Sequence, residues 1–169
     1  YISPHKMALV LPGIVPSYVL RQESEAQLRD AVLSGLHTVI VGEQGYAQNC
    51  IGKTSILVSS LHKMLREEEL REVCWIDFSH YRCEKVPFKG ILCDVANRLL
   101  SSFRYILNAP SDPKTFACCS EKELQDYIRG LLNYLLLRGV STSGFILALD
   151  GVTHQAEVSM FAFLGLQTI

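Results

Sequence analysis

Short, continuous apolar runs alternate with amphipathic helical patterns along this chain, and this alternation constrains the fold more than any other feature. The runs occupy residues 38–41, 73–78 and 145–149. Runs of this kind are typical of strands buried on both faces of a parallel sheet. Their order among the helical segments predicts an α/β domain with a mainly parallel sheet and crossover connections. In such sheets, binding sites lie beyond the carboxyl ends of the strands.

Two of the predicted helices carry a sequence signal at their first turn. Ser24 with Gln27, and Ser120 with Glu123, have the spacing of capping boxes, in which each side chain bonds the other residue's backbone N–H. The first helix is therefore predicted to begin after Ser24 and to end at Gly35, and the last to begin after Ser120.

Two further helices are predicted from apolar spacing alone. The first covers residues 52–66, and the second follows Pro87 with one long apolar face over residues 88–106. Residues 80–86 show neither period and are predicted to be irregular.

Composition places these elements in one folded domain and excludes several partners. The 169 residues are 49% hydrophobic and 20% charged, with a net charge of −1 and no basic block, which argues against a nucleic-acid partner. No apolar run approaches the length of a membrane span, so no membrane partner is expected. Six cysteines without a C-x-x-C pair indicate reduced thiols and a cytoplasmic location. Residues 1–20, with three prolines, are expected to form an extended lead-in to a domain at 21–169.

The segment after the first apolar run has the composition of a phosphate-binding loop. It continues from the strand through a glycine-containing loop to a helix that opens with Gly52, Lys53 and Thr54. Backbone amides at a helix N-terminus attract phosphate, the lysine neutralises it, and the threonine hydroxyl is a magnesium ligand. The literal spacing begins at Ala47, in a looser form of the motif. If residues 46–50 are an insertion, a full motif remains, and the predicted nucleotide-binding residues are Gly42, Gly45, Ile51, Gly52, Lys53, Thr54 and Ser55.

The last apolar run ends at an acid, Asp150, which is the candidate magnesium ligand beside Thr54 and the candidate catalytic residue. The positions after it, Gly151 and Thr153 among them, include no second acid to orient an attacking water. Hydrolysis is therefore expected to be weak or absent.

Four segments together resemble a known family. They are residues 17–23, 39–45 with 51–55, 74–78 and 145–152. In this order they look like the nucleotide-binding domain of the signal-transduction ATPases with numerous domains, in the NB-ARC and NACHT branches. The resemblance implies a P-loop NTPase three-layer sandwich, incomplete here at its C-terminus because the family module continues further. It also implies an ADP/ATP switch that uses Mg²⁺, self-association or contact with other domains of a longer chain, and a place for Arg21 near the adenine or ribose.

Residues 46–50 leave two interpretations of the phosphate-binding loop open. Either the loop bulges at these residues and still closes around phosphate, or the insertion enlarges it beyond a phosphate's size and the domain is a non-catalytic oligomerisation or interaction module. A small kinase or GTPase is a third reading. The chain has no Asn-Lys-x-Asp segment, and Arg129 and Arg138 are predicted to be exposed helix positions rather than parts of a lid.

Overall fold

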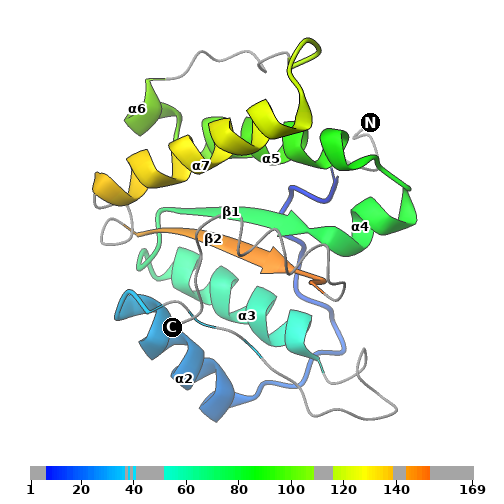
Figure 1. Ribbon diagram of the computed structural model, residues 1–169. Helices are drawn as coiled ribbons and strands as arrows, with labels where there is room; N and C mark the ends of the chain where they lie inside the picture. Colours follow the sequence, from blue (N-terminus) through cyan, green and yellow to red (C-terminus); the bar gives the residue numbers. More distant parts are fainter. Residues whose placement is uncertain are drawn as a thin grey trace.

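The computed structural model describes residues 7–36, 38, 40, 52–108, 116–138 and 144–152. They form a mixed α/β structure with helices on both faces of a two-stranded parallel sheet (Figure 1). Strand β1 (Glu72–Asp77) pairs with β2 (Phe145–Asp150) in register from one end to the other. The two later strand predictions are thereby confirmed. The first falls partly outside the described residues, and its described members, Thr38 and Ile40, belong to no strand.

Helices α5 (Phe88–Ser102) and α7 (Glu121–Leu137) cover one face of the sheet (Figure 1). The core on this side is formed by apolar side chains that are almost completely buried, among them Cys74, Ile76, Leu92, Val95, Leu99, Leu124 and Ile128. Removing this apolar surface from water is the main stabilising contribution to such a layer.

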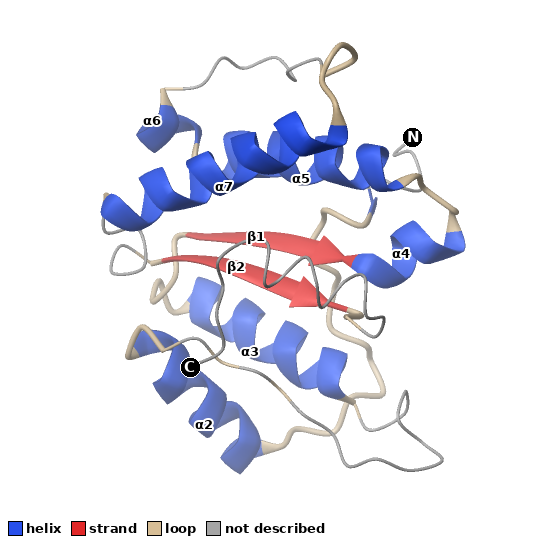
Figure 2. Cartoon of the chain, viewed as in Figure 1, coloured by secondary structure: helices blue, strands red, loops and turns tan. Residues whose placement is uncertain are grey.

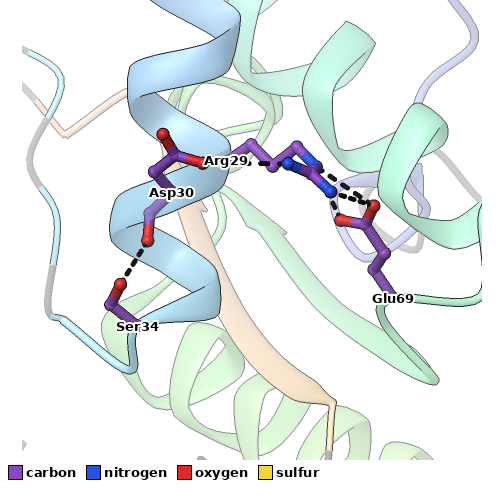
Figure 3. Close-up of polar contacts among 4 residues, drawn as sticks. All are labelled: Arg29, Asp30, Ser34 and Glu69. Atoms are coloured by element: carbon purple, nitrogen blue, oxygen red, sulfur yellow. Dashed lines mark hydrogen bonds and ion pairs between the residues drawn. The ribbon is translucent and has the colours of Figure 1, made fainter.

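Helices α3 (Lys53–Arg66) and α2 (Gln22–Leu33) form the layer on the other face. Leu61 and Met64 of α3 pack in a second core with Trp75 of the sheet. Helix α2 lies outside α3, and its Arg29 forms a bidentate ion pair with Glu69 beyond the end of α3 (Figure 3). The Arg29 Nε and Nη2 atoms lie 2.8 and 2.6 Å from the two carboxylate oxygens. The hydrogen bond from Arg29 lowers the pKa of Glu69.

Of the two predicted capping boxes, one is confirmed and one is wrong. The N–H of Glu123 donates to Ser120 Oγ (3.2 Å), and the N–H of Ser120 donates to the Glu123 carboxylate (2.7 Å). Helix α2 instead begins at Gln22 with Arg21 as its N-cap, so Ser24 already lies inside the helix. Two glutamates in its first turn favour this earlier start, because acids stabilise the positive end of a helix dipole.

Two other helix boundaries differ from the predictions. Helix α4 (Phe78–Cys83) follows β1 with no loop between them, where an irregular stretch was expected (Figure 2). Asp77 ends the strand and caps this helix, because its side chain accepts a hydrogen bond from the N–H of Ser79 (2.9 Å). The predicted helix over 88–106 is interrupted at Phe103, beyond which α6 (Arg104–Leu107) forms a separate turn.

The lead-in segment packs against the domain at two points. The Ala8 carbonyl accepts a hydrogen bond from the N–H of Asp77 at the end of β1 (2.8 Å), and Ala8 itself is fully buried. Further on, the Pro12 carbonyl lies 2.6 Å from Nε2 of His62 on α3. The lead-in thus connects the edge of the sheet to the α3 layer.

Candidate functional site

The carboxyl ends of β1 and β2 lie at the same end of the molecule as the N-terminus of α3 (Figure 2). Here the Thr54 hydroxyl donates to the Asp150 carboxylate, with Oγ1 3.0 and 3.1 Å from its two oxygens. These two residues are 96 positions apart in the sequence. The structure therefore brings together the two side chains that the sequence predicted to share a magnesium ion.

Helix α3 begins in the way the phosphate-loop interpretation requires. Gly52 is its N-cap, in the left-handed conformation (φ 73°), and Lys53 is its first residue. The N–H of Ile56 donates to the Gly52 carbonyl (2.9 Å), which starts the helical ladder. The amides of the first turn, including that of Ser55, therefore have no carbonyl partner within the helix, an arrangement that favours a nearby anion.

Arg21 lies against the start of α3. A Cβ atom added to Gly52 would stand 3.5 Å from Arg21 Nη2 and 3.7 Å from its Cζ. The guanidinium is thus placed beside the predicted phosphate-binding turn. Residues 41–51, with the predicted Gly42, Gly45 and Ile51 and the 46–50 insertion, lie outside the described residues.

The electrostatics of Asp150 fit a cation ligand. Burial raises the pKa of this carboxyl, and the neighbouring charge of Asp77 raises it further. The Thr54 hydrogen bond, the Gly151 amide and the Lys53 charge act in the opposite direction on the same pKa. A cation bound beside Asp150 would favour the ionised form of this carboxyl. One carboxylate, one hydroxyl and a nucleotide's phosphates are the donors that Mg²⁺ takes while keeping several waters. Within the described ranges, no group of three or more His, Cys, Asp or Glu residues gathers as an all-protein metal site.

Asp77 belongs to this site and was not predicted. In the strand register, Asp77 is the partner of Asp150. Trp75 on β1 and Ala148 on β2 both pack in the α3-side core, and strand residues two apart share a face. Asp77 and Asp150 therefore lie side by side on the α3 face. Both strands end in the same acid, β1 as Trp-Ile-Asp and β2 as Ala-Leu-Asp, and this repetition was the only signal for Asp77 in the sequence.

The turn after β2 is packed against the start of α4. Gly151 has φ 70°. A Cβ atom added to it would collide with Ser79 Oγ. The same Cβ atom would lie 2.9 Å from Ser79 N and 3.1 Å from Asp77 Oδ1. The Arg82 guanidinium donates to the Gly151 carbonyl (2.9 Å). Only glycine fits this position, which explains why no acid directly follows Asp150.

Comparisons of the chain with protein-family models, curated proteins and solved structures found no match. In the described part of the chain, no helix has the length and apolar content to cross a membrane. The contacts of Thr54, Asp150 and Arg21 are therefore the observations from which a function can be inferred.

Proposed function

We propose that this chain is the nucleotide-binding switch domain of a signal-transduction ATPase, a P-loop NTPase of the NB-ARC or NACHT type that binds ADP or ATP with Mg²⁺. The hydrogen bond between Thr54 and Asp150 carries the proposal. It joins the hydroxyl that follows Lys53 to an acid at the end of a parallel strand, as in P-loop magnesium sites.

Each remaining part of the site has a role in this proposal. The first-turn amides of α3 and the Lys53 ammonium would hold the phosphates, and Gly42, Gly45 and Ile51 would complete the loop. Arg21 would contact the nucleotide from the lead-in side. Magnesium bound with the nucleotide supplies positive charge that neutralises the phosphate oxygens.

The layer arrangement supports a P-loop sandwich. Helices α2 and α3 lie on one face of the sheet and α5 and α7 on the other (Figure 1). The predicted cytoplasmic location and self-association through further domains belong to the same proposal.

The role of the Thr54 hydroxyl can be tested with a matched pair of variants. Thr54→Val keeps the shape of the side chain and removes the hydroxyl, whereas Thr54→Ser keeps the hydroxyl. Calorimetry would measure ATP and ADP binding with Mg²⁺ and with a chelator. We expect Thr54→Val to lose about tenfold in magnesium-dependent affinity, or about 1.4 kcal/mol, and Thr54→Ser to stay near the parent chain. Equal magnesium dependence in all three chains would contradict the assignment.

A further inference from the structure

We infer that Asp77 is the second carboxylate of the nucleotide site and orients the water that attacks the terminal phosphate of ATP. This inference rests on the proposed function. The sequence alone predicted weak or absent hydrolysis, because Gly151 and Thr153 stand where a second acid would follow Asp150. A catalytic role for Asp77 instead predicts measurable hydrolysis.

The position of Asp77 is the first argument. Asp77 is the register partner of Asp150. The two residues lie on the same face of the sheet, each at the carboxyl end of its strand. Paired strands lie about 4.8 Å apart, so a group bound at Asp150 is within reach of Asp77 directly or through one water.

The structure leaves no room for a side chain at Gly151, the position directly after Asp150. The carboxylate oxygen Oδ1 of Asp77 stands 3.1 Å from where a Cβ atom of residue 151 would be. Ser79 and, beside it, the Asp77 carboxylate therefore occupy the space into which an acid directly after Asp150 would project its side chain. The chain places a carboxylate at this location from the neighbouring strand.

The backbone and the side chain of Asp77 are both held in place by hydrogen bonds. The Asp77 backbone is fixed by its N–H bond to Ala8, and its side chain is oriented by the N–H of Ser79. Arg82 supports the surrounding turn through the Gly151 carbonyl and, at 3.5 Å, the Ser79 hydroxyl. A carboxylate has about four acceptor sites, so the cap to Ser79 leaves capacity to accept a hydrogen bond from water. A catalytic group held in one orientation loses little entropy when the reaction occurs.

The reaction is hydrolysis of the terminal phosphoryl group. The water oxygen forms a bond to the terminal phosphorus while the bond from that phosphorus to the bridging oxygen breaks. The electron pair of the broken bond stays on ADP. One water proton passes to Asp77 and from there to the released phosphate, so Asp77 ends the cycle as a carboxylate.

Single-turnover ATP hydrolysis by the 169-residue chain tests this role, with Mg-ATP binding and thermal unfolding measured on the same samples. Asp77→Asn removes the charge and keeps an oxygen that can cap α4, because asparagine is as good an N-cap as aspartate. We expect this variant to unfold at a temperature no lower than the parent chain, because the Asp77 charge that opposes ionisation of Asp150 is gone, and to bind Mg-ATP as tightly, while hydrolysis falls about 100-fold. Asp77→Glu should recover part of the rate. Asp30→Asn, which removes an exposed acid on α2, should leave it unchanged.

The outcomes separate this inference from the proposed function. If the parent chain binds Mg-ATP and hydrolyses it no faster than buffer, or if Asp77→Asn hydrolyses at the parent rate, the inference fails and the nucleotide site stands. A loss of ATP binding in Asp77→Asn would show a structural role and would also overturn the inference. If the parent chain binds no nucleotide, both fail.

Discussion

Asp150 ends β2 as a half-buried acid whose carboxylate accepts a hydrogen bond from the Thr54 hydroxyl. Its pairing with Thr54 was predictable because each residue lies in its own recognisable pattern, an apolar strand ending in acid and a helix opening with Gly-Lys-Thr. Asp77 was not predictable in the same way. Its role depends on which strands pair and in which register, and a single sequence does not contain that information.

The raised pKa of Asp150 has a measurable effect on stability. Burial and the Asp77 charge disfavour the ionised form in the folded chain, so ionisation lowers the free energy of unfolding. This cost is fully present above the raised pKa and disappears as the pH falls through it toward the ordinary aspartate value. Asp150→Asn keeps an oxygen to accept from Thr54 and carries no charge. We therefore expect it to unfold at a higher temperature than the parent at pH 7.5, with a difference that vanishes near about pH 3.

Thermal unfolding across pH, without nucleotide, would check this expectation, with Asp30→Asn as an exposed control. A lower midpoint for Asp150→Asn than for the parent at pH 7.5 would contradict it. Adding Mg-ATP should reverse the order, because only the parent chain keeps the carboxylate that the cation uses.

At the scale of elements, local caps decided which boundaries could be predicted. The Ser120 box marks the start of α7 because both of its hydrogen bonds are local in sequence. Helix α4 was missed because it has only six residues, too few to show a helical period, and because its cap, Asp77, also ends a strand. The break at Phe103 was missed because the apolar spacing continues past it into α6.

The packing of α4 on the turn after β2 makes a prediction about two glycines. Gly151→Ala forces a side chain into Ser79 at a left-handed position, so we expect a loss of about 1–3 kcal/mol in the free energy of unfolding. Gly130→Ala, in α7 with open space around it, should instead stabilise the chain by about 0.5–1 kcal/mol. Urea unfolding of both variants checks the pair. Equal effects at the two positions would show that the turn is not packed as described.

At the scale of the whole molecule, one stretch of chain contacts the strand, the helix and the site in turn. The lead-in bonds β1 at Ala8 and reaches α3 at Pro12, and Arg21 then lies beside Gly52. The parallel sheet with helices on both faces was predictable from the alternation of apolar runs and helical segments. The course of the lead-in was not, because its hydrogen bonds to β1 and α3 are made by backbone carbonyls, which leave no pattern in the side chains.

Nucleotide affinity is the most direct measurement. Calorimetry would give the dissociation constants of the parent chain for Mg-ADP and Mg-ATP, beside Lys53→Ala and a chain that lacks residues 46–50. Because Thr54, Asp150 and the start of α3 are already in place, we expect the parent to bind. Lys53→Ala should lose at least about tenfold in affinity. Binding that is unchanged in Lys53→Ala, or that appears only when residues 46–50 are deleted, would contradict a working nucleotide site in this chain.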